Sequence, residues 1–308
     1  SASIGIASSL PAHASGEEVL RNAHTALTRA KKSGRARQET FQTAMFLETV
    51  RDFQMERDLR KALQRGELHV QYQPIVDLSD GTITGFEALA RWKHPELGPI
   101  SPADFIPVAE EAGLVADIDR WVLETAARQA AEWQHAAGGP VVLSVNVSSK
   151  QFALEGLVEH VVQVLRTSGL PPSCLKLEIT ESAVMVQPEG AAQILADVKR
   201  LGVLLALDDF GTGYSSLSHL HRFPFDTLKV DRSFVSRMGS AGQDPEFVKT
   251  MLSLAACLGM DTVAEGIETN LQRGLLTELG ARYGQGYLFA RPVDPAEAVQ
   301  LLADKRTW

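Results

Sequence analysis

The amino-acid sequence predicts an α/β protein whose main part is a TIM-like (β/α)8 barrel with one antiparallel strand. Eight short apolar runs alternate with helical patterns across residues 66–308, which is typical of a closed β/α barrel. The turn Ser79-Asp80-Gly81 separates the first two runs, so these strands should pair as a hairpin and one must be antiparallel. An open doubly wound sheet is the alternative, but the glycine-rich turn expected after its first strand is missing.

The residues that precede the barrel predict a strand, a helix and a connecting helix. Residues 3–8 have the composition of a strand, and residues 17–32 show an amphipathic helical pattern. One strand and one helix cannot bury a core alone, so residues 1–45 are interpreted as the end of a truncated domain. Three apolar residues on one helical face predict a linker helix over residues 46–65.

Within residues 66–308, periodicity places the elements in chain order. Short apolar runs predict strands at residues 70–76, 83–89, 141–147, 175–179, 203–207, 227–230, 262–264 and 283–289. The first helix after the hairpin begins at Ser101-Pro102, where serine can cap the helix and proline suits its first turn. Helical spacing predicts the other helices at about 117–135, 150–168, 188–201, 245–259, 267–279 and 294–303.

Composition and charge exclude several classes of protein. The 308 residues are 44% hydrophobic, as in globular proteins, and the longest apolar stretch, residues 252–260, is too short for membrane insertion. The formal net charge of −8 disfavours binding to a nucleic-acid polymer. Cys174 and Cys257 lack disulfide or metal spacing and the N-terminus lacks a signal-peptide pattern, which predicts a cytoplasmic protein.

Polar residues recur at the ends of the predicted strands. They are Glu87, Asn146, Glu178, Asp208, Asp209, Lys229 and Glu265. In a β/α barrel these strand ends surround one mouth, where catalytic residues gather. Each residue alone would more often be a helix cap or a solvated loop residue, and Lys229 could simply pair with Asp231 at the surface. Asp208 and Asp209 are harder to explain in this way, because adjacent carboxylates repel each other unless a cation lies between them.

The types of ligand indicate the metal and the reaction. Carboxylate and amide oxygens without histidine or cysteine favour hard cations such as Mg²⁺ or Mn²⁺. Five or six such donors can hold two ions with one aspartate bridging them, an arrangement that supports phosphoester hydrolysis. Lys229 would orient the nucleophile or neutralise developing charge. The residues therefore predict a two-metal phosphodiesterase acting on a small anionic substrate.

The same residues stand in segments that resemble the EAL family of bacterial cyclic di-GMP phosphodiesterases. The motif that names the family occurs as Glu87-Ala88-Leu89, followed by Ala90-Arg91-Trp92, and Tyr72-Gln73-Pro74 matches the family's first strand. Further matches follow in order: Asn146-Val147-Ser148, Leu177-Glu178-Ile179-Thr180-Glu181, Asp208-Asp209-Phe210-Gly211-Thr212-Gly213, Leu228-Lys229-Val230-Asp231, Ala264-Glu265-Gly266-Ile267-Glu268 and Gln285-Gly286-Tyr287. The resemblance covers residues 57–308.

The resemblance implies hydrolysis of cyclic di-GMP to linear pGpG with two Mg²⁺ or Mn²⁺ ions. It implies that the first ion is held by Glu87, Asn146, Glu178 and Asp208. Asp208 and Asp209 would hold the second ion, with Glu265 as a ligand or general base and Lys229 at the attacking water. Ca²⁺ is expected to bind the same oxygen ligands but to inhibit, because its looser coordination positions water badly.

The resemblance also implies which residues contact the substrate. The expected contacts are Gln73, Leu89, Arg91, Asp231, Glu268 and Gln285. Arg91 would bind phosphate, whereas Gln73 and Gln285 would contact the nucleotide. Glu181 and Thr212 are expected to support the metal ligands from behind, a role that Glu268 could share.

The N-terminal piece resembles the end of a GGDEF domain, the domain of diguanylate cyclases. The match lies in Ala2-Ser3-Ile4-Gly5-Ile6-Ala7 and Asn22-Ala23-His24-Thr25-Ala26-Leu27, and it departs from the family at His24 and Thr28, where an acid and a tyrosine are usual. The resemblance implies an upstream GGDEF domain in the parent protein and no cyclase activity in this fragment. The resemblance of the barrel to the EAL family leads us to expect a homodimer formed through the barrel.

Two alternatives to an active cyclic di-GMP phosphodiesterase remain. EAL domains that have lost catalysis persist as cyclic di-GMP receptors, typically after replacement of a metal ligand, and this sequence keeps every ligand. A barrel enzyme acting on another phosphoester or sugar phosphate would require the agreement of motifs to be accidental. Turnover of cyclic di-GMP with Mg²⁺ would separate the enzyme from both alternatives.

Overall fold

The computed structural model describes residues 1–8, 15–32, 34, 36–136, 140–211, 221–239, 245–304 and 307–308. These residues form two compact units. One comprises Ser1–Arg65 and Ala103–Ala112, and the other comprises Gly66–Pro102 and Gly113–Trp308.

The smaller unit contains a two-stranded parallel sheet and helices. In chain order its elements are β1 (Ile4–Ile6), α1 (Gly16–Lys32), β2 (Gln38–Thr40), α2 (Thr43–Arg65) and most of α3 (Pro102–Ala112). Gly5 lets α1 pack on the sheet, because a Cβ atom there would lie 2.1 Å from the carbonyl oxygen of Ala23. The sequence did not predict β2, since its residues are polar and show no apolar alternation.

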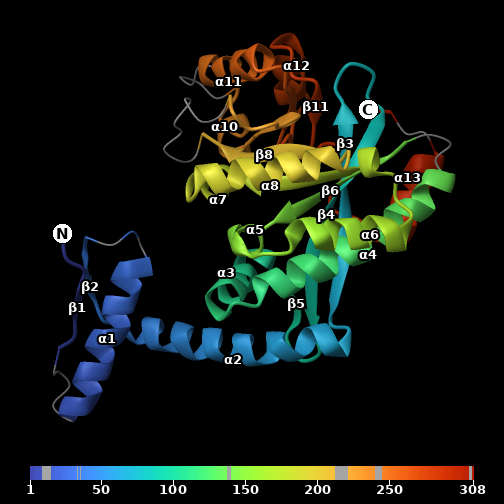
Figure 1. Cartoon of the computed structure of the whole chain (residues 1–308). Helices are drawn as coiled ribbons and strands as arrows, with labels where there is room; N and C mark the ends of the chain where they lie inside the picture. The colour runs from blue at the N-terminus through green and yellow to red at the C-terminus, as the bar shows by residue number, and fades with distance from the viewer. Residues whose placement is uncertain are drawn as a thin grey trace. The chain divides into compact units, whose positions relative to one another are not determined.

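The larger unit is a closed barrel (Figure 1). Its strands hydrogen-bond in the order β3-β11-β10-β9-β8-β7-β6-β4, and pairing of β3 with β4 closes the ring. Their bounds are β3 (Leu68–Asp77), β4 (Ile83–His94), β6 (Val142–Val147), β7 (Leu175–Thr180), β8 (Leu204–Phe210), β9 (Thr227–Val230), β10 (Asp261–Ala264) and β11 (Tyr283–Gly284). Strand β3 is antiparallel to both neighbours, whereas the other ring pairs are parallel. The predicted barrel with one antiparallel strand is therefore confirmed.

Helices between the strands cover the outer surface of the barrel (Figure 1). They are α4 (Val115–Ala136), α5 (Ser149–Ala153), α6 (Leu157–Ser168), the short helix η1 (Pro172–Cys174), α7 (Glu181–Met185), α8 (Pro188–Arg200), α10 (Arg232–Val235), α11 (Glu246–Cys257), α12 (Asn270–Glu278) and α13 (Pro295–Ala303). None of the helices in the described part of the chain combines the length and the apolar character needed to cross a membrane.

Besides the strand predicted at 83–89, which continues to His94, three predicted elements differ from the structure. The helix expected at 150–168 is interrupted at Gly156, whose φ of 95° cannot continue a right-handed helix. The helix expected at 267–279 begins only at Asn270, after a capping box in which Thr269 and Gln272 bond each other's backbone. The strand expected at 283–289 ends at Gly284, because the chain then folds against the segment after β10 and Leu288 donates to the carbonyl of Ile267.

Elements that the sequence did not predict are short. Besides β2, they are β5 (Gly98–Ile100), η1, α7 and α10. Elements of three to five residues contain too few residues to show a period, so tertiary contacts decide them.

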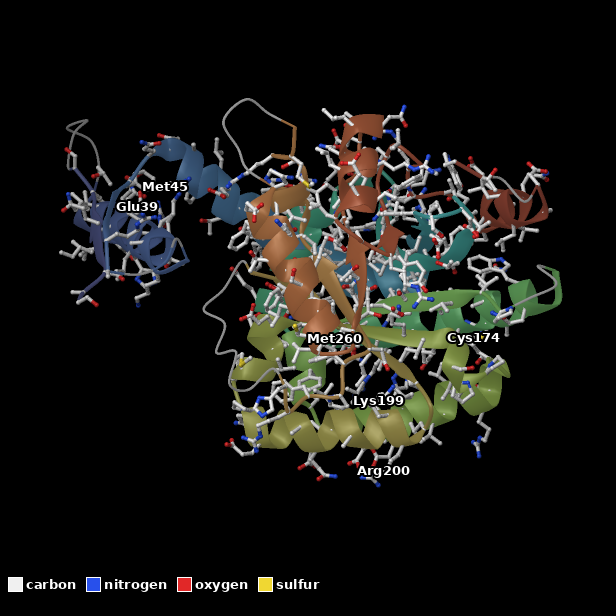
Figure 2. All side chains as sticks on the ribbon, turned by 90° about the horizontal axis from the view of Figure 1, so that it is seen from above. Glu39, Met45, Cys174, Lys199, Arg200 and Met260 are labelled. Carbon is white, nitrogen blue, oxygen red and sulfur yellow. The ribbon has the colours of Figure 1, made fainter. Side chains whose placement is uncertain are left out.

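Aromatic packing and an ion pair attach helices to the barrel. Trp133 of α4 is buried against Tyr72 and Phe86, with ring centroids 4.7 and 5.0 Å away. At the end of α8, the Lys199 ammonium lies 2.8 Å from a carboxylate oxygen of Asp226, whose other oxygen accepts the N–H of Leu205 in β8. Figure 2 shows Lys199 turned toward the barrel and its neighbour Arg200 at the outer edge.

Candidate active site

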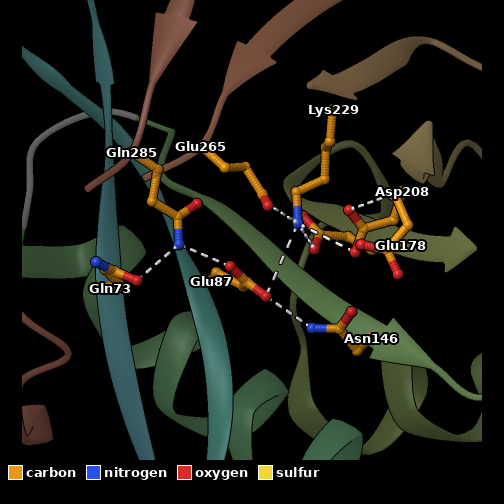
Figure 3. A network of polar contacts seen from close by, with 9 residues as sticks. Gln73, Glu87, Asn146, Glu178, Asp208, Lys229, Glu265 and Gln285 are labelled. Atoms are coloured by element: carbon orange, nitrogen blue, oxygen red, sulfur yellow. Dashed lines mark hydrogen bonds and ion pairs between the residues drawn. The ribbon is translucent and has the colours of Figure 1, made fainter. Parts of the chain in front are cut away.

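Six polar side chains from neighbouring strands meet at one end of the barrel (Figure 3). They are Glu87 on β4, Asn146 on β6, Glu178 on β7, Asp208 on β8, Lys229 on β9 and Glu265, which follows β10. Because parallel strands end at the same edge, residues at equivalent positions on them point into a common space. Six of the seven polar residues predicted at the strand ends therefore lie together, and Asp209 is not among these six.

The position of Glu87 differs from the prediction, in which it closed its strand. Strand β4 continues beyond it to His94. The extension is stable because its residues pair with β3 on one side and with β5 on the other. Glu87 thus lies at the mouth while the rest of β4 extends past it.

Lys229 lies at the centre of the cluster and is 1% exposed. Its ammonium is 2.5 Å from Glu178, 2.7 Å from Glu265, 3.3 Å from Asp208 and 3.8 Å from Glu87. The alternative of a surface pair with Asp231 is wrong, since Asp231 instead caps α10 by accepting the N–H of Ser233 at 2.9 Å. Lys229 therefore belongs to the site.

One ammonium faces four carboxylates, which leaves an excess of negative charge. Burial, together with repulsion from neighbouring acids, raises the pKa of Glu178 and of Glu265 to about 8. Burial alone would lower the pKa of Lys229, but Asp208, Glu178, Glu265 and Glu87 raise it well above its usual value. The cluster holds its full negative charge only if further cations compensate it.

The donor atoms of these residues are of the kind that binds divalent metal ions, but their arrangement in the structure is not that of a metal site. Four carboxylates and the amide of Asn146 form an oxygen donor set suited to Mg²⁺ or Mn²⁺. Among the described residues, however, no group of three or more histidine, cysteine, aspartate or glutamate side chains is arranged as a metal site. The ammonium of Lys229 lies where these four carboxylates converge, and each of them is oriented toward it.

A bulge at the end of β8 separates the surroundings of two adjacent aspartates: Asp208 is buried and lines the cavity described below, whereas Asp209 is exposed. The pairing of β8 with β9 shifts register between Leu207 and Phe210. Asp209 has a φ of 55°, uncommon outside glycine, and donates its N–H to a carboxylate oxygen of Asp208 at 2.9 Å. Partial burial, then repulsion from Asp208 and Asp231, raises the pKa of the Asp209 carboxyl.

Both carboxylate oxygens of Glu87 are held by amides. Asn146 donates to one oxygen at 2.7 Å, and Gln285 donates to the other at 2.7 Å. The same amide nitrogen of Gln285 also donates to Gln73 at 3.0 Å (Figure 3). The side-chain amide oxygen of Gln285 is buried and has no partner among the described residues, so it is available to a ligand.

An open cavity of about 260 Å³ lies beside the cluster. It is lined by Gln73, Glu87, Leu89, Asp208, Lys229, Arg232, Ser236, Glu265, Gly266, Glu268, Gln285, Gly286 and Tyr287. Acids, amides and one exposed aromatic ring thus surround a space next to the carboxylate cluster, which suits a polar ligand with flat rings.

Comparison with protein families matches residues 56–292 to the EAL domain, and the motif Glu87-Ala88-Leu89 lies on β4 at the mouth. The chain belongs to the EAL domain family.

Two curated relatives of this EAL domain come from Pseudomonas aeruginosa. The bifunctional diguanylate cyclase/cyclic di-GMP phosphodiesterase MucR is 41% identical over 303 residues, which cover 98% of this chain and 44% of MucR. The cyclic di-GMP phosphodiesterase NbdA is 38% identical over 286 residues, which cover 93% of this chain and 36% of NbdA. The chain spans less than half the length of these relatives.

Solved structures of EAL domains share its barrel. The PaMucR phosphodiesterase in complex with c-di-GMP is similar with a TM-score of 0.77 and 41% identity over 80% of this chain and 99% of that one. The FimX EAL domain of Xanthomonas citri in complex with c-di-GMP has a TM-score of 0.69 and 30% identity over 78% of this chain and 93% of that one.

The cavity of this EAL domain contains most of the substrate contacts predicted from the sequence. Gln73, Leu89, Glu268 and Gln285 line it. The lining residues that sequence reasoning missed are Arg232, Ser236, Gly266, Gly286 and Tyr287. Most of them directly follow predicted residues along the chain, and that adjacency could have indicated them.

Three further predicted residues, Arg91, Asp231 and Glu181, are not among those that line the cavity, and a fourth, Thr212, lies outside the described residues. Glu181 is buried at the start of α7, where its carboxylate accepts the N–H of Gly211 at 3.4 Å.

Proposed function

We propose that this EAL domain hydrolyses cyclic di-GMP to linear pGpG with two bound divalent cations, Mg²⁺ or Mn²⁺. The observation that carries the proposal is the cluster of four carboxylates around Lys229, beside an open cavity. A phosphodiester is an anion and would be repelled by this cluster unless cations reversed the local field. The phosphodiesterases MucR and NbdA support the class of reaction.

The chain's own residues divide into metal ligands and groups that act on water. Glu87, Asn146, Glu178 and Asp208 would hold one cation, and Asp208 and Asp209 the second. The cations would supply an activated water and neutralise charge on the phosphate. Glu265 would complete a ligand set or accept the proton of the water. Because the cations would compensate the charge of the four acids, Lys229 would be able to donate a hydrogen bond to the attacking water.

The substrate contacts follow from the walls of the cavity. The side-chain amide oxygen of Gln285, which has no partner among the described residues, would accept a hydrogen bond from the nucleotide, with Gln73 beside it. Leu89 and Glu268 line the same space. Arg91 would bind a phosphate of the substrate, and Asp231 would contact it from the start of α10.

Turnover tests the proposal directly. Cyclic di-GMP incubated with the protein and Mg²⁺ or Mn²⁺ should yield pGpG, measured by chromatography, and a chelator should stop the reaction. Ca²⁺ in place of Mg²⁺ should support nucleotide binding without turnover. Binding without product under all three metals would exclude the enzyme, and absence of binding would exclude any cyclic di-GMP function.

A matched pair of variants assigns the ligands. Glu87→Ala should lower kcat by at least about 10³-fold while nucleotide affinity changes little, because a ligand acting in the transition state is lost. Glu96→Ala, on the loop that follows β4, should leave both unchanged. Wild-type turnover in Glu87→Ala would show that the ligand assignment is wrong.

A receptor without turnover is the second candidate. It is favoured by the position of Lys229, whose ammonium fills the space where the carboxylates converge. The FimX EAL domain, solved in complex with c-di-GMP, shows that a related barrel binds this nucleotide.

We also propose that residues 1–45 are the end of a GGDEF domain and that the protein is a homodimer. The alignment with MucR, a bifunctional diguanylate cyclase/phosphodiesterase, covers 98% of this chain and therefore reaches into this segment. Ile4 and Ile6 of β1 are 51% and 40% exposed, as expected for a sheet face that packs against a further layer. Light scattering tests the homodimer and should give twice the chain mass. Hydrogen exchange tests the GGDEF assignment: adding the upstream domain should slow exchange of the amides of both isoleucines.

A further inference from the structure

Strands β3 and β4 share a face past the cavity that is polar except at Leu89. Their register pairs Gln73 with Glu87, Gln71 with Leu89 and His69 with Arg91. Because side chains alternate along a strand, these six residues face the same side. Arg91 therefore lies two positions beyond Leu89, the last residue of β4 that lines the cavity.

Two nitrogens of the Arg91 guanidinium already donate hydrogen bonds within the protein. Its Nε donates to the amide oxygen of Gln71 at 2.9 Å, and Nη1 donates to the carbonyl of Ala90 at 2.9 Å. These bonds fix the plane of the group and leave Nη2 without a partner among the described residues. A guanidinium held in one plane can donate to a phosphate oxygen with less entropy left to lose.

Gln71 is itself held by Asp294, which precedes α13. The amide nitrogen of Gln71 donates to a carboxylate oxygen of Asp294 at 3.1 Å. An ionised carboxylate only accepts hydrogen bonds, so Gln71 must turn its NH₂ toward Asp294 and its carbonyl oxygen toward Arg91. The charge of Asp294 thus sets the orientation of the amide.

The backbone keeps these two side chains within reach of each other. Tyr72 and Val293 exchange both backbone hydrogen bonds, at 2.8 and 2.9 Å, as an isolated antiparallel bridge. Gln71 and Asp294 are the sequence neighbours of this bridged pair. The contact between residues 223 positions apart is therefore built into the pairing of β3 with the segment before α13.

We propose that Asp294 and Gln71 form a positioning relay that holds Arg91 ready to bind a phosphate of the cyclic dinucleotide. The proposal rests on the proposed function, in which Arg91 contacts phosphate. Neither Gln71 nor Asp294 touches the substrate, and both act through Arg91. Loss of the relay should weaken nucleotide binding and raise KM, while the chemical step at the carboxylate cluster continues.

The test compares Gln71→Leu with Arg91→Ala and the double variant. Gln71→Leu should raise KM about tenfold and change kcat less than about twofold, whereas Gln193→Leu, which removes a similar amide–carboxylate bond on α8, should change neither. Gln71→Leu should have no further effect in the Arg91→Ala background, because the relay acts only through that arginine. Asp294→Ala should reproduce Gln71→Leu, and Gln71→Ala replaces Gln71→Leu if the leucine variant does not fold.

The outcomes separate this proposal from the proposed function. If the wild type neither turns over nor binds cyclic di-GMP, both fail. Suppose that the wild type is active and Arg91→Ala is impaired. If Gln71→Leu is then normal, or if the effects of Gln71→Leu and Arg91→Ala on KM add in the double variant, the relay is wrong while the proposed function stands. If the protein binds without turnover, Kd from calorimetry replaces KM, with the same expected changes. A normal Arg91→Ala variant overturns the relay.

Discussion

At the level of single residues, Lys229 explains how the barrel can fold around four carboxylates. Its ammonium contacts Glu178 and Glu265 most closely and is removed from solvent. Buried acids without a partner would be strongly destabilising, so this one side chain compensates for charges that β4, β7, β8 and the end of β10 bring together.

Replacement of this lysine should therefore destabilise the protein as well as inactivate it. Lys229→Met should lower the free energy of unfolding in chelator by about 3–5 kcal/mol, the usual cost of breaking a buried ion pair. Lys249→Met is the control, since Lys249 pairs with Glu246 at the exposed surface and should contribute less than about 1 kcal/mol. Urea denaturation measures both values, and equal effects would contradict the central role of Lys229.

The raised pKa values of Glu178 and Glu265 predict a stability that falls with pH. Between the usual pKa of about 4.5 and the folded value of about 8, the folded protein holds protons that the unfolded chain has released. The free energy of unfolding in chelator should accordingly decrease from pH 5 to pH 8 by more than about 1.4 kcal/mol, the equivalent of one pKa unit. Glu178→Gln should reduce this slope, and a flat profile for the wild type would show that the acids are ionised without metal.

At the level of elements, the junction after β11 shapes the cavity. Gly286 follows the strand, and a Cβ atom there would lie 2.1 Å from the carbonyl oxygen of Ile267. The two neighbouring residues, Gln285 and Tyr287, line the cavity. The close approach of backbone to backbone at Gly286 therefore holds a binding wall in place.

Because of this close approach, two glycine-to-alanine substitutions should change the free energy of unfolding in opposite directions. Gly286→Ala should destabilise the protein by more than about 1 kcal/mol and weaken nucleotide binding, because backbone atoms must move apart. Gly274→Ala, inside α12 where no atom lies within 4 Å of the added Cβ, should stabilise by about 0.5–1 kcal/mol. Thermal denaturation would distinguish them, and a tolerated Gly286→Ala would refute the tight junction.

At the level of the whole molecule, the closed ring couples metal binding to the stability of the barrel. The proposed ligands come from separate strands and meet only when the ring is complete. A cation that binds the folded state alone stabilises it by mass action.

Mg²⁺ should thus raise the melting temperature of the wild type. At a concentration one hundred times its Kd the gain should be about 2.7 kcal/mol. Glu178→Gln should show a smaller gain, because it lacks one charged ligand. If Mg²⁺ did not shift the wild-type melting curve in differential scanning calorimetry, the metal assignment would be wrong.

Much of this architecture was predictable from the sequence because strand and helix periods are local properties. The runs ending at Asn146 and Glu178 read as buried strands, and the barrel rule then placed their polar ends at one mouth. The break at Gly156 and the early end of β11 were not predictable, since one depends on a backbone torsion and the other on packing against the segment after β10.

The sequence by itself determined the chemistry of the site, since oxygen donors without histidine or cysteine favour hard cations wherever the fold brings them together. Only the tertiary structure decided the partners. Lys229 contacts four acids instead of its sequence neighbour Asp231, and Arg91 is held by Gln71, which is in turn held by Asp294. The physical reason is that such contacts depend on strand register and ring closure, which bring together residues far apart in the chain.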